Sequence, residues 1–480
     1  MSTTTTPAPV LSSRRRFGVL AICCMSLLIV GMDATIVNVA LPVIGRDLST
    51  GVTGLQWVVD AYTVVLASLL ILAGSLGDRF GRKRTFQVGL LLFVSASVAC
   101  SLAPSLPWLV AFRMVQAVGG SMLNPVALSI VTNVFTDPRE RARAIGIWAG
   151  VVGLGLGLGP VAGGALTGTL GWRAIFWINL PIGLAAVVLA ALFVPESRAP
   201  RARRLDPVGQ VLVVTVLAGL TYAIIEAPLA GASSPRIVAP CAVAALAFAL
   251  LLRVESRRVE PLIELGFFRS VPFAGATVTA VCAFAAFSGF LFLTTLYLQE
   301  VRGLSPLAAG LLLSPMAVMV VIGAPLAGRW VGARGPRLPL VAAGVLMTAG
   351  AALLLTVTAA TSYAVLVLGF VVFAAGFGVV NPPITNAAVS GMPRERAGVA
   401  AAIASTSRQV GASLGVAVVG SLAHAAGGPS AGARPGWIVV VACGCAVTVL
   451  AVVTTSARAV RTGVAAGDAP VALPGQEVPA

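Results

Sequence analysis

Fourteen apolar runs, most of them about 20 residues long, dominate this chain. A segment of about 20 apolar residues can cross the hydrocarbon core of a bilayer. Backbone N–H and C=O groups in that core must be satisfied within their own segment, so each run is expected to be a helix. The ten-residue alternation of a membrane barrel is absent from the sequence. We therefore predict an all-α polytopic membrane protein with spans at approximately 17–40, 55–77, 86–103, 107–131, 141–168, 173–194, 207–228, 236–253, 272–299, 304–328, 337–358, 362–389, 397–424 and 436–456.

Composition and the placement of charge support this class of protein. Of the 480 residues, 58% are hydrophobic and 10% are charged, whereas soluble proteins carry about 25% charged residues. The net charge of +16 could indicate a nucleic-acid partner. With the N-terminus in the cytoplasm, however, 25 of the 32 Lys and Arg fall in cytoplasmic loops or tails and only five fall outside. This asymmetry predicts a cell-membrane protein with both termini in the cytoplasm and no nucleic-acid partner.

The chain repeats itself once in the same order, which predicts two similar helical bundles in tandem. Leu72–Gly74 returns as Leu326–Gly328, Asn124-Pro125 returns as Asn381-Pro382, and Pro138–Ala142 returns as Pro393–Ala397. The shift between copies is eight helices, which is six for a bundle and two for an inserted pair. The expected parts are a tail at 1–16, a six-helix bundle at 17–195, an inserted pair at 205–255, a six-helix bundle at 262–456 and a tail at 457–480.

Charged residues inside the spans are candidates for function, because each costs about 2.5–3.5 kcal/mol at a helix centre. Asp33 and Arg113 are the strongest candidates for proton coupling. Asp60 and Arg408 are also candidates, and for these two a structural ion pair or interfacial role is an equal alternative. Glu226 lies near the end of its span, where an exposed interfacial carboxylate is the better interpretation.

A dense polar segment, residues 74–84, lies between two spans at the cytoplasmic side. Simple topogenic charge would need only its basic residues. The additional carboxylate and glycines favour a cytoplasmic gate made by Gly74, Asp78, Arg79, Gly81 and Arg82. In the second copy Gly332 replaces Asp78, so a gate there would have to differ.

Glycines surround a proline in the span 141–168, where a smooth helix face and a break in the hydrogen-bond ladder are expected. A hinge that presses on the other bundle and a plain packing kink are the two interpretations. The residues are Gly153, Gly159, Pro160, Gly163 and Gly164.

A substrate site is expected near the midplane between the two repeats. Few buried charges are available, so the cavity would suit amphipathic solutes. Candidate walls are Trp57, Tyr62, Asn124, Phe292 and Tyr297, although a Met or Phe on these helices is more often core or lipid-facing than a ligand contact.

Metal and enzymatic chemistry are not expected. The seven cysteines all lie in apolar spans, and no zinc-ligand spacing occurs. The sequence contains no ATP-binding loop and no nucleophile–base arrangement. We predict no enzyme activity, no metal and no cofactor beyond protons as the coupling ion.

These motifs together resemble the major facilitator superfamily, in particular its fourteen-helix drug:proton antiporters. The resemblance covers about residues 17–456 and lies in the segment 74–84, Arg113 with Gln116, Gly119 and Gly120, Gly150 to Gly164, Asp33-x-Thr35-x-x-Asn38 to Pro42, Trp172-Arg173 with Phe176, Asn179 and Pro181, and Tyr297–Gln299 before Gly303. It implies the major facilitator fold and proton-driven export of amphipathic compounds, often antibiotics or lipophilic cations.

Three alternatives remain open. A nutrient or metabolite proton symporter of the same fold is the nearest, and the glycine–proline segment argues against it. A lipid or polysaccharide flippase is compatible with the composition. A proton-pumping respiratory subunit would need lysines in its spans, but the single lysine, Lys83, lies in a loop. The expected partners are an amphipathic small molecule and the bilayer, with a monomeric chain.

Overall fold

The computed structural model describes residues 12–199, 205–258, 261–389, 397–426, 429–456 and residue 459. These residues form helices with short connections, and no strand occurs among them. Twelve of the helices found there are long and apolar enough to cross a membrane, and Arg337–Ala352 is a shorter apolar helix. Each of the fourteen expected spans falls on a helix, so the all-α prediction is confirmed. Most of the second copy of the 138–142 pattern, residues 393–396, and most of both expected tails lie outside the described residues.

The described chain divides into two compact units. Unit 1 contains the residues up to Leu205 together with Thr295–Val321, and unit 2 contains Asp206–Thr294 and the residues from Ile322 onward. The helices of unit 1 are α1 (Ser13–Asp47), α2 (Val52–Phe80), α3 (Arg82–Ser101), α4 (Leu106–Val134), α5 (Pro138–Leu170), α6 (Ala174–Trp177) and α7 (Asn179–Phe193). The remaining helices are α8 (Pro207–Ala230), α9 (Pro235–Glu255), α10 (Val271–Leu296), α11 (Pro306–Arg334), α12 (Arg337–Ala352), α13 (Tyr363–Val389), α14 (Ala397–Ala425) and α15 (Pro429–Thr454). The last two residues of α10, the residues that connect it to α11 and the first half of α11 belong to unit 1.

The two helices that the sequence places between the repeats, α8 and α9, pack on each other in unit 2. α8 also attaches to α14 of the same unit. The Ser421 hydroxyl donates to the Ile224 carbonyl at 2.6 Å, and the hydroxyl oxygens of Thr221 and Ser413 are 3.5 Å apart. The inserted pair is therefore joined through α8 to a helix of the second repeat.

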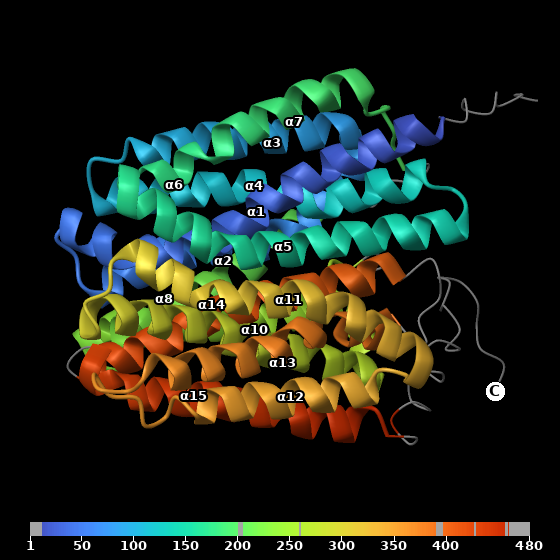
Figure 1. Ribbon diagram of the computed structural model, residues 1–480. Helices are drawn as coiled ribbons and strands as arrows, with labels where there is room; N and C mark the ends of the chain where they lie inside the picture. The colour runs from blue at the N-terminus through green and yellow to red at the C-terminus, as the bar shows by residue number, and fades with distance from the viewer. Residues whose placement is uncertain are drawn as a thin grey trace, which may run out of the picture. The chain divides into compact units, whose positions relative to one another are not determined.

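In unit 1, α1 lies alongside α5 and α3 lies alongside α7 (Figure 1). Glycines four residues apart on one face of α5 allow the α1 backbone to come close, because residues i and i+4 share a helix face. A Cβ at Gly155 would lie 2.9 Å from the Leu28 carbonyl oxygen, and one at Gly163 would lie 2.6 Å from that of Ile36. No larger side chain fits these positions without moving a helix.

The opposite face of α5 meets the first half of α11 in the same way. A Cβ at Gly157 would lie 2.9 Å from the Ala317 Cα, and one at Gly164 would lie 2.5 Å from the Pro306 carbonyl oxygen. The glycine-rich segment thus packs closely on two helices of unit 1.

Pro160 leaves one carbonyl of α5 without its helical hydrogen-bond donor, and a side chain of α1 supplies a donor in its place. Proline has no N–H, so the carbonyl four residues earlier, that of Leu156, loses its helical donor. The Thr35 hydroxyl donates to this Leu156 oxygen at 3.0 Å. The contact also fixes the rotation of α1, which orients the neighbouring Asp33.

We expect Thr35→Val to lower the stability of the protein by about 1 kcal/mol, because it keeps the shape of the side chain but leaves the Leu156 carbonyl unsatisfied. Thermal unfolding of the purified protein measures this. In a Pro160→Ala background the helix supplies its own donor, so the same substitution should have a smaller effect. Thr277→Val is the matched control, since Thr277 donates only to its own helix, at the Phe273 carbonyl. An equal loss for Thr35→Val with and without Pro160 would contradict this account.

Candidate functional site

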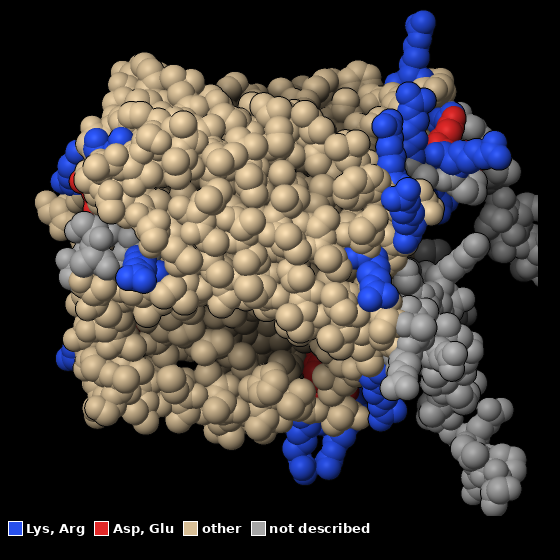
Figure 2. Space-filling model, turned by 60° about the horizontal axis from the view of Figure 1, so that its bottom comes forward, with Lys and Arg blue, Asp and Glu red and all other residues tan. Residues whose placement is uncertain are grey.

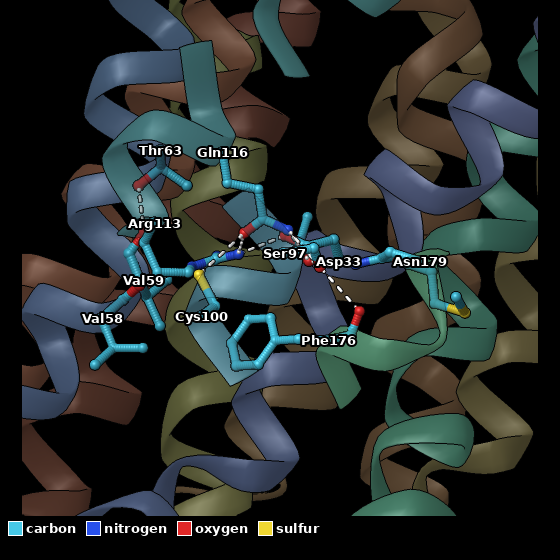
Figure 3. Close-up of polar contacts among 12 residues, drawn as sticks. Asp33, Val58, Val59, Thr63, Ser97, Cys100, Arg113, Gln116, Phe176 and Asn179 are labelled. Atoms are coloured by element: carbon cyan, nitrogen blue, oxygen red, sulfur yellow. Dashed lines mark hydrogen bonds and ion pairs between the residues drawn. The ribbon is translucent and has the colours of Figure 1, made fainter. Parts of the chain in front are cut away.

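A buried ion pair joins α1 and α4 in unit 1. The Arg113 Nη1 atom is 2.5 Å from Asp33 Oδ2, and the two side chains are 1% and 0% exposed. The same guanidinium donates to Gln116 Oε1 at 2.8 Å and to the Val58 carbonyl at 3.3 Å (Figure 3). Such a pair is tolerated in a low-dielectric interior only where further hydrogen bonds satisfy the remaining N–H groups of the guanidinium and the remaining lone pairs of the carboxylate.

The second oxygen of Asp33 is held by two amides. Gln116 Nε2 donates to Asp33 Oδ1 at 2.9 Å, and Asn179 Nδ2 donates to the same oxygen at 3.1 Å. Asp33 therefore accepts hydrogen bonds from three side chains on α4 and α7. An ionised carboxylate only accepts hydrogen bonds, so this arrangement fits the charged form of Asp33.

Asn179 joins the expected span 173–194 to this network. The structure has this span as one apolar segment, Ala174–Phe193, in which α6 and α7 meet at Ile178 with helical backbone angles there, φ −61° and ψ −27°. Asn179 also donates to Ser97 Oγ on α3 at 3.0 Å, and Ser97 donates to the Phe176 carbonyl at 2.9 Å. The span is thereby tied to α3, next to Asp33 (Figure 3).

Two predicted residues of α2 lie in unit 1 with the ion pair. The Tyr62 ring stacks on the Arg113 guanidinium, 4.1 Å from Cζ to the ring centroid, which is a cation–π contact. Tyr62 is fully buried and so supports Arg113. Asp60 is also buried, and Thr63 Oγ1 lies 3.3 Å from Asp60 Oδ1.

Arg408 belongs to unit 2 and has different partners. It donates to Asn381 Oδ1 at 3.2 Å and lies 3.5 Å from Thr385 Oγ1. Within the part of the chain that the structure describes, no carboxylate forms an ion pair with Arg408. The other residues predicted to line a cavity are divided between the units, with Trp57 and Asn124 half-buried in unit 1, Tyr297 buried in unit 1 and Phe292 buried in unit 2.

The polar segment 74–84 forms a compact cluster where α2 meets α3. Asp78 Oδ1 is 2.8 Å from Arg82 Nη2. Gly81 connects the helices at φ +113°, a conformation that other residues rarely adopt. Glu196, which follows α7, accepts from the Lys83 backbone N–H at 3.1 Å and lies 3.7 Å from Arg84 Nε. Glu196 could not be selected from sequence, because it lies more than 100 residues from the segment.

A π-helical turn, Tyr297–Val301, follows α10 and contacts α1. Gln299 is buried, and its Nε2 donates to the Val39 carbonyl at 2.7 Å. Val39 is six residues beyond Asp33 on the same helix, which is about 9 Å along its axis. Such π-helical turns are rare and frequent at functional sites.

Sequence reasoning selected the charged members of the network and missed the amides. Gln116, Asn179 and Gln299 each lie within motifs noted in the sequence. For Gln116 the neighbouring charge of Arg113, one helical turn away, was an available indication of its role. Among the described residues, no group of three or more His, Cys, Asp or Glu is placed to hold a metal ion.

We expect Arg113→Gln to destabilise the protein by about 3–5 kcal/mol, because it leaves the Asp33 carboxylate buried and unpaired. Adding Asp33→Asn should restore part of this loss, and thermal unfolding of both variants measures it. The exposed pair Arg173–Asp47, with side chains 43% and 46% exposed, is the control. Arg173→Gln should change stability by at most about 1 kcal/mol. A double variant less stable than Arg113→Gln would contradict the pairing.

Comparison with known proteins agrees with the helical architecture and the motifs. The family model described as Major Facilitator Superfamily matches residues 23–416. The chain is 39% identical over 398 residues to the "Multidrug resistance protein Stp" of Mycobacterium tuberculosis, covering 83% of this chain and 74% of that protein. It is 40% identical over 419 residues to the "Tetracenomycin C resistance and export protein" of Streptomyces glaucescens, covering 87% and 77%.

Solved structures show the same fold at low sequence identity. A D-xylose-proton symporter matches with a TM-score of 0.65 at 14% identity, covering 92% of this chain and 97% of that chain. A peptide transporter in complex with sulfate matches with a TM-score of 0.68 at 16% identity, covering 95% and 97%. From the family match over most of its length and these relatives, the chain belongs to the major facilitator superfamily.

Proposed function

We propose that this protein exports amphipathic drugs or antibiotics from the cytoplasm in exchange for protons. The observation that carries the proposal is the Asp33 carboxylate, buried in a membrane helix and held by Arg113, Gln116 and Asn179. Relatives at 34–40% identity are named as multidrug or antibiotic resistance and efflux proteins, which supports export as the direction of transport.

Protonation of Asp33 would change every contact of the site. The neutral acid gains a donor and loses the charge that offsets Arg113. Arg113, Gln116 and Asn179 would then have to find other acceptors, and they lie on two helices, α4 and α7. Proton binding is thus linked to a rearrangement of helices, which is the requirement for coupling a proton to alternating access.

The orientation that we propose places the arginine-rich helix ends and both termini in the cytoplasm. Figure 2 shows a face largely free of charged side chains, with Lys and Arg gathered toward the ends of the helices, most of them on the right. Basic residues concentrate on the cytoplasmic side of membrane proteins. In this orientation the end of α1 at Asp47 would face outward.

The proposed substrate site uses residues of unit 1 that the sequence selected, Trp57 and Tyr297, with Asn124 as a polar contact. Aromatic faces bind the flat apolar parts of drugs and also attract cations. A nutrient symporter of the same fold is the second candidate, supported by the fold of the D-xylose-proton symporter. Direction distinguishes the two, because an importer raises accumulation of its substrate and an exporter lowers it.

Asp33→Asn should abolish protonophore-sensitive efflux, because the amide cannot carry a proton at this position. The measurement is efflux of a fluorescent lipophilic cation from a pump-deficient host that expresses each variant at equal level. Asp47→Asn, on the same helix but exposed and paired with Arg173, is the control and should retain most of the activity. Undiminished proton-dependent efflux by Asp33→Asn would remove Asp33 from the coupling mechanism.

We further propose that the Asp78–Arg82 pair and Glu196 form the cytoplasmic gate. Asp78→Asn should lower the efflux rate severalfold while drug affinity changes little, because the pair stabilises one conformation and does not touch the drug. Efflux rate and equilibrium drug binding are measured on the same protein. Gly332→Asp added to this variant should not restore the rate. Asp137→Asn, which removes a helix-capping carboxylate elsewhere in unit 1, is the control. An unchanged rate for Asp78→Asn would leave this segment with a topogenic role only.

A further inference from the structure

A groove of about 730 Å³ runs between the beginning of α1 and the end of α7 in unit 1. On α1 it is lined by Gly18, Ala21, Ile22 and Met25, which share one helix face at spacings of three and four residues. Leu192 and Phe193 of α7 line the other side and are 64% and 43% exposed. Apolar side chains so exposed on a membrane helix face the lipid, so the groove opens toward the bilayer.

Two arginines lie at one end of the groove. Arg14 and Arg15 line it, and neither has an ion-pair or hydrogen-bond partner among the residues that the structure describes. The next residue, Arg16, is engaged elsewhere, with Glu140 as its ion-pair partner and the Phe135 ring under its guanidinium. Among the described residues that line the groove there is no carboxylate. Its polar end therefore presents two unneutralised guanidinium groups to a ligand.

The dimensions of the groove correspond to one leaflet of a bilayer. From Arg14 to Met25 is eleven residues, or about 17 Å along a helix. Half of the hydrocarbon core of a bilayer is about 15 Å. Small residues, Gly18 and Ala21, leave open space along the floor of the groove, and a Cβ added at Gly18 would meet nothing within 4 Å. An extended acyl chain can lie there with its headgroup at the level of the arginines.

We propose that this groove binds an anionic phospholipid of the bilayer. Arg14 and Arg15 hold the phosphate headgroup, and one acyl chain lies along Gly18, Ala21 and Met25 against the apolar end of α7. Basic pockets between transmembrane helices are a known way to select acidic headgroups, and guanidinium groups pair with phosphate oxygens in a fixed geometry. The site is separate from the Asp33 network and does not depend on the direction of transport or on the transported compound.

The test uses the full-length protein purified in detergent, with phosphatidylglycerol or phosphatidylcholine added at equal concentration and bound lipid counted by native mass spectrometry. The wild type should retain one phosphatidylglycerol in preference to phosphatidylcholine. An arginine near an acidic headgroup contributes about fivefold in affinity, so Arg14→Gln with Arg15→Gln should weaken phosphatidylglycerol binding by about 25-fold. Gly18→Leu, which fills the floor of the groove, should weaken binding with both arginines present.

Matched controls separate this site from general attraction of acidic lipid to a basic protein. Arg329→Gln with Arg337→Gln removes the same charge from exposed positions of unit 2, and Gly328→Leu makes the same enlargement at another open position. Both controls should bind phosphatidylglycerol within about twofold of wild type. Equal loss in the two double-arginine variants, unchanged binding by Gly18→Leu, or equal retention of phosphatidylcholine would each overturn the proposal.

Discussion

The Asp33 carboxylate is the charge around which unit 1 is arranged. A buried ion pair is stable only when its remaining hydrogen-bonding capacity is met. The Asp33 carboxylate receives these hydrogen bonds from Arg113 and Gln116 on α4 and from Asn179 on α7. Both helices must therefore keep their positions along α1. The stacking of Tyr62 on Arg113 adds α2 to the same requirement. Four helices thus meet at one ion pair.

The helices and the two main charges could be predicted from the sequence, because hydrophobic length and intramembrane charge are local properties. The partners of those charges could not. Asn179 and Asp33 are separated by 146 residues, and an uncharged amide in a span carries little penalty that would draw attention to it. The change at Ile178 between α6 and α7 has a local signal, because Pro181 lacks the N–H that would bond to the Trp177 carbonyl. The hydrogen bond from Thr35 to Leu156 follows from Pro160 only when the pairing of α1 with α5 is known.

The two repeats share sequence patterns but differ in chemistry. Asn124-Pro125 and Asn381-Pro382 are equivalent in sequence. Asn381 accepts a hydrogen bond from Arg408, whereas the buried arginine of unit 1, Arg113, pairs with the Asp33 carboxylate. Asp78 forms an ion pair, and its counterpart is Gly332. Among the described residues the buried Arg–Asp pair therefore occurs in the first copy, and the second copy has an arginine bonded to an amide in its place.

The length of α1 has a thermodynamic consequence. Along this one helix lie the groove beside Gly18, the carboxylate of Asp33, the Thr35 contact to α5 and the Val39 carbonyl that accepts from Gln299. Binding at any of these positions that favours one placement of α1 must alter affinity at the others. Linkage of this kind is reciprocal. If a lipid in the groove changes the proton affinity of Asp33 by some factor, protonation of Asp33 changes the affinity for that lipid by the same factor, so membrane composition and proton gradient would act on a single equilibrium.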